Sequence, residues 1–200
     1  MKREITRDDI IDMESYGATR RERRRAILGE KKDRRVPVGP VVNFHFETYD
    51  TMWLQVHEML YIEQGGEEQI PGELEAYNPL IPKGDELVAT VLFEIEDPEE
   101  RRKFMARMGG VEDCMFMEVN GERIRGREEG DVERSTADGQ ASTVHFVHFH
   151  FTPGQIRAFQ QPGTRVLLGI EHPNYSHMAV LPEATRASLA GDFASEAAAA

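Results

Sequence analysis

The alternation of apolar and polar residues predicts several short strands, most of them in the second half of the chain. Residues 41–47 and 87–96 alternate with a period of two, which is typical of strands with one face buried. Asn120-Gly121, between residues 114–119 and 122–126, is a strong signal for a hairpin turn. Further strands are predicted over residues 143–151, 165–170 and 177–181.

A helical pattern dominates the first third of the chain. Thr6 and Asp9 resemble a capping box, and we expect a short helix up to residue 15 that Gly17 breaks, then a second helix over residues 19–34. A third helix should end at Glu63, before two glycines. Weaker or shorter helices are expected over residues 67–77, 98–109, 153–160 and 182–193.

This order of elements predicts an α+β fold. N-terminal helices precede strands that are joined mainly by hairpins and short connecting helices, so we expect one domain with a largely antiparallel sheet. We divide the chain into a basic, helical N-terminal segment (1–36), an α+β body (37–193) and a disordered alanine tail (194–200). The polar segment 128–141 is expected to be mobile.

Composition narrows the class of protein. The net charge is −12, yet residues 20–35 hold nine Lys/Arg against three Asp/Glu. The acidic remainder disfavours nucleic acid. No segment is apolar enough to span a membrane or to act as a signal peptide. A single cysteine, Cys114, excludes an internal disulfide and favours a reduced, cytoplasmic protein.

Glu63 is the first candidate for chemistry. Met52, Val56 and Met59 form a helical stripe that ends at Glu63, and a carboxylate on an apolar face needs a cation, a donor or a proton. The alternative is a helix-end carboxylate that reaches solvent or pairs with an arginine. The preceding His57-Glu58 resembles the start of a zinc-protease motif, which fails because its second histidine is absent.

The histidines supply further candidates. His145 shares the apolar face of its strand, so it is either a satisfied core histidine or a site residue. His148 and His150 share the opposite face, where a His-x-His pair could chelate a metal or simply be exposed. His172 begins a turn and could instead bond its own backbone. The polar stripe Asn43, His45 and Glu47 could meet these histidines if the two strands are neighbours.

Several strings of residues resemble one bacterial family, catalogued as domain of unknown function 3501. They are Ile5-Thr6-Arg7-Asp8-Asp9, residues 32–35, Phe46-Glu47, Gln55, Glu58-Met59-Leu60, Glu63, Glu73-Leu74-Glu75-Ala76-Tyr77-Asn78-Pro79-Leu80-Ile81-Pro82, Val144-His145-Phe146 and His172-Pro173-Asn174-Tyr175. The resemblance implies a role beside non-haem iron or peroxide-stress chemistry, with rubrerythrin-like or iron–sulfur proteins as partners. It favours as ligands Glu47, Glu58, Glu63, His145 and His172, and disfavours His45, His148 and His150.

Three functions follow as hypotheses. The first is a metal-binding accessory protein, for iron above other divalent metals, with Glu63, His145 and His172 as ligands and Glu47 and Glu58 as further ligands or supports. The second is a non-catalytic interaction module whose basic helix Arg20–Arg35 docks an acidic partner or a second copy of the chain. The third is an enzyme that uses Glu63 as a general base.

Overall fold

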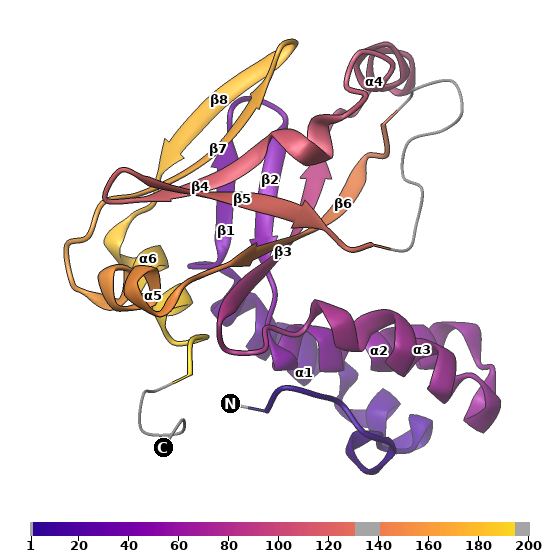
Figure 1. Ribbon diagram of the computed structural model, residues 1–200. Coiled ribbons are helices and arrows are strands. Elements are labelled where there is room, and N and C mark those ends of the chain that lie inside the picture. Colours follow the sequence, from indigo (N-terminus) through magenta and orange to yellow (C-terminus); the bar gives the residue numbers. More distant parts are fainter. Residues whose placement is uncertain (1, 131–140, 195–200) are drawn as a thin grey trace.

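The computed structural model describes residues 2–130 and 141–194, and its centre is an eight-stranded antiparallel sheet (Figure 1). The strand order is β1-β2-β3-β6-β5-β4-β7-β8. The strands are β1 Arg35–Val38, β2 Val42–Phe46, β3 Glu86–Phe93, β4 Met115–Val119, β5 Glu122–Glu128, β6 Val144–His150, β7 Val166–His172 and β8 Tyr175–Val180. The predicted α+β class with an antiparallel sheet is confirmed.

The sheet curls until its two edge strands come close together. The Tyr175 hydroxyl at the start of β8 donates a hydrogen bond of 2.6 Å to the Val38 carbonyl at the end of β1. Gly39, which follows with φ +73°, lies against the same tyrosine, since an added Cβ would be 2.4 Å from the hydroxyl oxygen. A side chain at position 39 would therefore force the two edges apart.

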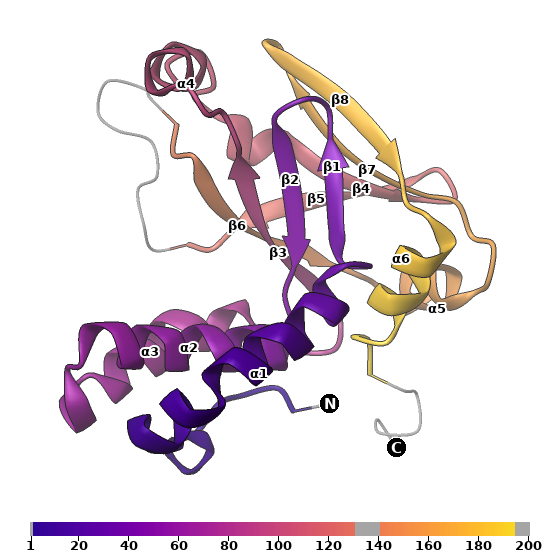
Figure 2. The same ribbon diagram turned by 180° about the vertical axis from the view of Figure 1, so that it is seen from behind.

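The helices lie at the two ends of the curled sheet. The three N-terminal helices, α1, α2 and α3, form a layer below it, α4 lies at the opposite end, and α5 and α6 pack together near the C-terminus (Figures 1 and 2). Their bounds are α1 Met13–Lys31, α2 Tyr49–Glu63, α3 Ile70–Tyr77, α4 Pro98–Met105, α5 Pro153–Gln160 and α6 Glu183–Ala190. No helix among the described residues combines the length and the apolar character that crossing a membrane requires.

Two apolar clusters hold the layers together. One fills the inside of the curled sheet and includes Phe44, Val91, Phe149 and Leu168, all fully buried. The other lies between the helical layer and the outer face of the sheet, where Val88 of β3 meets residues such as Val56 of α2. Since β3 is covered on both faces, its sequence is apolar almost throughout.

The N-terminal region differs from the prediction in two ways. Gly17 does not break the helix, and α1 runs without interruption through it. Residues 35–38 form β1 instead of following a helix to residue 34, and Pro37 is tolerated there because β1 hydrogen-bonds to β2 alone. The expected boundary at residue 36 thus falls inside a strand. The alanine tail from 195 onward and residues 131–140 of the expected mobile segment lie outside the described residues.

Candidate metal centre

Glu63 lies in solvent at the end of α2. The buried face of the helix follows Met52, Val56 and Leu60, so the expected stripe through Met59 is rotated away from the core and Glu63 is exposed. Its carboxylate accepts a hydrogen bond of 2.8 Å from the Gln69 side-chain amide. The expectation that this carboxylate follows the apolar face is wrong. The buried apolar residues of α2 are spaced by four, whereas the expected stripe passed through Met59 and so reached Glu63.

Glu58 is held by α1 and is half-buried, although the helical projection pointed it away from the core. Arg20 donates two hydrogen bonds to it, of 2.8 and 2.7 Å, and the Tyr16 hydroxyl donates a third of 2.6 Å. These bonds, that of Arg20 above all, keep the pKa of Glu58 below its usual range. The carboxylate is therefore fully engaged in joining α1 to α2.

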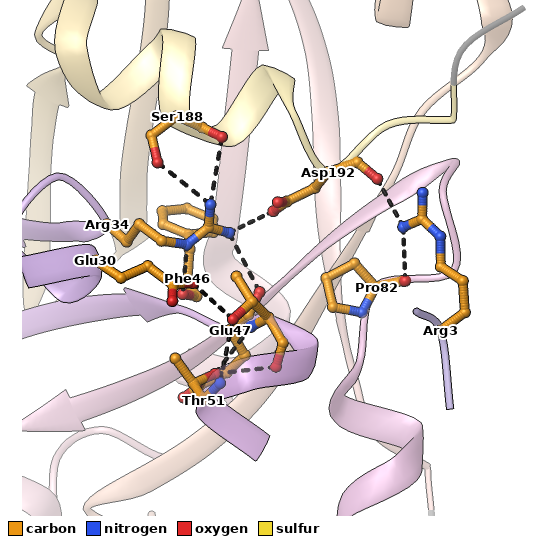
Figure 3. Close-up of polar contacts among 10 residues, drawn as sticks. Arg3, Glu30, Arg34, Phe46, Glu47, Thr51, Pro82, Ser188 and Asp192 are labelled. Carbon is orange, nitrogen blue, oxygen red and sulfur yellow. Dashed lines mark hydrogen bonds and ion pairs between the residues drawn. The ribbon is translucent and has the colours of Figure 1, made fainter. Parts of the chain in front are cut away.

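Glu47 belongs to a buried polar network that joins several elements (Figure 3). Its two carboxylate oxygens accept hydrogen bonds of 2.6 Å from Thr51 and from Thr90. Its carbonyl accepts from Arg34, which also forms a buried ion pair with Asp192, beyond α6. This network ties together the end of α1, β2, α2 and the chain after α6.

His145 and His172 lie at the same end of the sheet, on its inner face. Both ring nitrogens of His172 bind backbone atoms, since Nε2 lies 3.2 Å from the Gly109 carbonyl and Nδ1 accepts from the Asn174 amide at 3.2 Å. The structure thus places His172 in the alternative role, as a turn histidine. His145 is fully buried and contacts Glu128 at 2.9 Å and the Ser142 carbonyl at 2.8 Å.

Glu112 joins His145 and Glu128 in one group whose potential ligand atoms lie within 4.8 Å of one another. Both glutamates also engage in further interactions. This is one of two such groups of three among the described residues, and it contains a single member of the expected ligand set, His145. The five expected ligands therefore do not gather at one point.

The second group lies on the outer face of the sheet and consists of Glu86, His148 and His150. Strand β6 points both histidines to one side because they are two residues apart. Glu86 begins β3 directly opposite His150. One of its carboxylate oxygens, Oε2, lies 2.8 Å from Nδ1 of His148 and 3.5 Å from Nδ1 of His150. The two imidazole rings stack with an interplanar angle of 17°.

Glu129 completes the surroundings of this centre. Its carboxylate lies 2.7 Å from Nε2 of His148, so each nitrogen of that ring faces a carboxylate. The second oxygen of Glu86 accepts from the Lys83 amide at 3.2 Å, which orients the carboxylate. Metal-binding histidines usually have one nitrogen on the metal and a carboxylate at the other. Glu129 supplies that carboxylate, although Nε2 of His148 forms no hydrogen bond in this geometry.

Burial and charge prepare the centre for a cation. The Glu86 side chain is 5% exposed and that of His148 11%, whereas that of His150 is 51% exposed, so the centre has a buried floor and an open side. Burial raises the pKa of Glu86, but the His148 hydrogen bond and the charges of both histidines outweigh burial and hold this pKa below its usual range. The carboxylate is accordingly ionised at neutral pH.

Two imidazoles and one carboxylate form the donor set of many non-haem iron(II) and zinc sites. Bonds of about 2.0–2.2 Å to a tetrahedral ion separate the ligand atoms by about 3.3 Å. The distances of 2.8 and 3.5 Å from Glu86 to the two histidines fall on either side of that value. The third separation, between the ligand atoms of the two histidines, is at most 4.8 Å, so the three side chains would close around an ion by drawing together.

The sequence led to His148 and His150 as a pair but missed Glu86 and Glu129. Their contribution depends on which strands pair, and strand pairing leaves no local signal. The proposed meeting of Asn43, His45 and Glu47 with the histidines of β6 does not occur, because β3 lies between β2 and β6. In their place the β3 strand itself brings Glu86 to the histidines.

Comparison with known proteins gives a family and a close structural relative. A crystal structure of a protein from Burkholderia pseudomallei K96243, described as a novel protein of unknown function, matches with a TM-score of 0.88 and 35% sequence identity, covering 95% of this chain and 99% of that one. No functionally curated protein matches the chain. The family model described as Protein of unknown function (DUF3501) matches residues 4–193. The chain therefore belongs to the DUF3501 family, as the resemblance in its sequence predicted.

Proposed function

We propose that this protein binds a divalent transition metal, iron(II) in the first place, at Glu86, His148 and His150. The observation that carries the proposal is the convergence of two imidazole nitrogens and a buried carboxylate on one open point, with Glu129 supporting His148. Three protein ligands leave coordination positions free for water or a further ligand. The bound ion would supply Lewis acidity or redox chemistry to that ligand.

The wider role that we propose is that of an accessory protein in a cytoplasmic redox or stress pathway, beside rubrerythrin-like or iron–sulfur proteins. The ligand types support iron rather than a thiolate-bound metal. Burial and the nearby carboxylates of Asp113 and Glu112 raise the pKa of the single thiol, Cys114, so it stays protonated and is a poor metal ligand. A reducing compartment suits both iron(II) and a free thiol.

The metal content of the purified protein tests this proposal directly. Protein purified without a histidine tag and loaded anaerobically with iron(II) or zinc should hold about one ion per chain by elemental analysis, as occupation of the proposed centre alone implies. His148→Ala with His150→Ala should lower that content at least tenfold, and Glu86→Gln should weaken binding with little change in shape. Circular dichroism checks that each variant is folded.

A second double variant distinguishes metal binding at the outer group, with His148 and His150, from binding at the inner group, with His145. Glu63→Ala with His145→Ala alters two members of the ligand set that the sequence predicted and leaves the outer face intact, so its metal content should equal that of the wild type. Full metal content in the His148/His150 variant would reject the proposed centre. Loss of metal in the folded Glu63/His145 variant alone would transfer the site to the inner face.

An interaction module is the second candidate, favoured by a basic hollow on α1. Arg21, Arg24 and Arg25 surround a hollow of about 480 Å³ together with Tyr61 and Leu28, whose exposed fraction of 68% is the largest among the exposed large apolar residues of the described chain. Arg20 lines the same hollow but is bound to Glu58, to which Arg24 forms a longer ion pair of 3.9 Å, and Arg34 is buried. The docking surface is therefore narrower than the whole range from residue 20 to 35, and an acidic segment of a partner or of a second copy would suit it.

Charge reversal tests this candidate. Arg21→Glu, Arg24→Glu and Arg25→Glu together should abolish binding of a fluorescent polyglutamate peptide, and wild-type binding should weaken as salt rises from 50 to about 300 mM, because exposed charges are screened over a Debye length. Reversal of Arg102, Lys103 and Arg107 around α4 is the control with an equal change of charge. Sedimentation shows whether a second copy is the partner. Salt-insensitive binding, or equal loss in the control, would contradict the docking surface.

A further inference from the structure

Strand β5 presents a row of arginines beside the two histidines of the candidate metal centre. Its residues alternate between the inside and the outside of the sheet, so Ile124 and Gly126 are buried while Arg123, Arg125 and Arg127 are exposed. Arg127 pairs directly with His148 in the register of β5 and β6. Cross-strand partners of this kind have Cβ atoms about 5 Å apart on the same face.

Gly126 brings the two strands together at this point. It pairs with Phe149, and a Cβ at position 126 would be 2.6 Å from a methyl group of Val147. Because Gly126 opposes Phe149, the arginines on either side of it flank the level of His148 and His150. The outer face thus carries, across β3, β6 and β5, a carboxylate, two imidazoles and two guanidiniums in succession.

Arg125 and Arg127 are available for a ligand. No hydrogen bond or ion pair joins either side chain to another residue in the described part of the chain. Arg123 differs, since it donates to Glu171 at 2.6 Å and its guanidinium lies 3.9 Å from the centre of the Phe116 ring. Unpaired exposed arginines are common, but these two adjoin a centre whose ligand set leaves coordination positions open.

We propose that the centre binds a small oxyanion, with one oxygen on the metal and another on Arg125 or Arg127. This inference rests on the proposed metal centre. A divalent ion neutralises the charges of Glu86 and Glu129, so the two arginines leave the site with a surplus of positive charge. A planar guanidinium donates two parallel hydrogen bonds to a carboxylate or to a phosphate-like group. Such an anion bridges the metal and the arginines. A neutral ligand on the metal would leave the two guanidiniums without an anionic partner.

The experiment uses cobalt(II) as a spectroscopic substitute for the native ion. The full-length protein with one cobalt bound is titrated with acetate and, separately, with sulfate, while the visible absorption bands of the cobalt are recorded. Acetate should shift these bands and saturate. In Arg125→Gln with Arg127→Gln, the acetate Kd should rise at least tenfold while the cobalt content stays at that of the wild type.

Arg102→Gln with Arg107→Gln, on and just after α4, is the matched control, because it removes two positive charges at the other end of the sheet, and its acetate Kd should stay within twofold of the wild-type value. Saturable shifts with sulfate as well as acetate would assign the site to oxyanions in general, and shifts with acetate alone would assign it to carboxylates. An acetate Kd unchanged in the Arg125/Arg127 variant, or no shift in the wild type, would overturn the inference while the metal centre stands. A wild-type protein that binds no cobalt would overturn the centre and this inference together.

Discussion

Partners decide the role of each buried polar residue in this protein. His57 and His148 are both buried, yet the nitrogens of His57 bind backbone atoms and those of His148 face two carboxylates. His57 is fully buried, accepts a hydrogen bond of 3.2 Å from the Ile11 amide and lies 2.7 Å from the Trp53 carbonyl. It is therefore a neutral, structural histidine that pins the N-terminal segment to α2.

His57 should make stability depend on pH. Burial lowers its pKa below the ordinary value, and the charge of Arg23 adds to this, against the opposing Trp53 hydrogen bond. The unfolded chain therefore binds a proton that the folded chain excludes, and stability should fall as pH drops below about 6.5, by up to about 1.4 kcal/mol per pH unit. Urea unfolding between pH 7.5 and pH 5 measures this slope.

His57→Gln should flatten that slope while lowering stability at pH 7.5 by about 1–3 kcal/mol, since a buried hydrogen-bonding pair is disturbed. His177→Gln, at an exposed histidine, should keep the wild-type slope. Part of the slope should persist in both, because burial also lowers the pKa of His45. Glu86, whose pKa is lowered, loses its contribution only at more acidic pH, below about 4.5. An unchanged slope in the His57 variant would contradict the assignment.

Among the elements, α1 shows how a local signal yields to packing. A glycine in the middle of a helix costs up to about 1 kcal/mol relative to alanine, which is why Gly17 predicted a break. In the fold, however, the absence of a side chain lets the Tyr61 ring of α2 approach, since a Cβ at position 17 would be 2.9 Å from it. The α1–α2 contact, with Glu58 and Arg20 beside it, compensates the unfavourable propensity.

The same glycine-to-alanine substitution at two positions of α1 distinguishes the effect of helix propensity from that of side-chain packing. Gly29 has open space around the position of its missing side chain, so Gly29→Ala should stabilise the protein by about 0.5–1 kcal/mol. Gly17→Ala should show no such gain, because its methyl group meets the Tyr61 ring. Thermal and urea unfolding of both variants compare them, and a Gly17→Ala protein as stabilised as Gly29→Ala would show that the close approach is unimportant.

At the scale of the whole molecule, the order of the strands creates the candidate centre. Glu86, His148 and Glu129 are far apart in the chain and meet because β3 and β5 lie on the two sides of β6. The neighbouring residues Glu128 and Glu129 lie on opposite faces of the sheet. Glu128 contacts His145 on the inner face, and Glu129 contacts His148 on the outer face. The uneven distribution of charge along the chain also corresponds to two separate places in the fold. The basic hollow lies on the helical layer, and the candidate metal centre lies on the sheet.

Local chemistry in the sequence was sufficient for most elements. The capping box of Thr6 and Asp9, the hairpin turn at Asn120-Gly121 and the alternation in β6 all appear in the structure as predicted, because each depends on residues within a few positions of one another. The antiparallel α+β class follows from the succession of these short elements. Even the division of the β6 histidines between two faces was readable, since it needs only the period of a strand.

Tertiary structure alone decided which side chains meet. Which face of α2 is buried depends on the elements that pack against the helix. In this packing Glu63 is exposed to solvent and Glu58 forms an ion pair with Arg20. The strand Arg35–Val38 exists because β2 offers it hydrogen bonds, and Glu86 faces His150 because β3 inserts between β2 and β6. Such pairings join residues about 10 to 60 positions apart and are chosen by the free energy of the whole core, which no local pattern records.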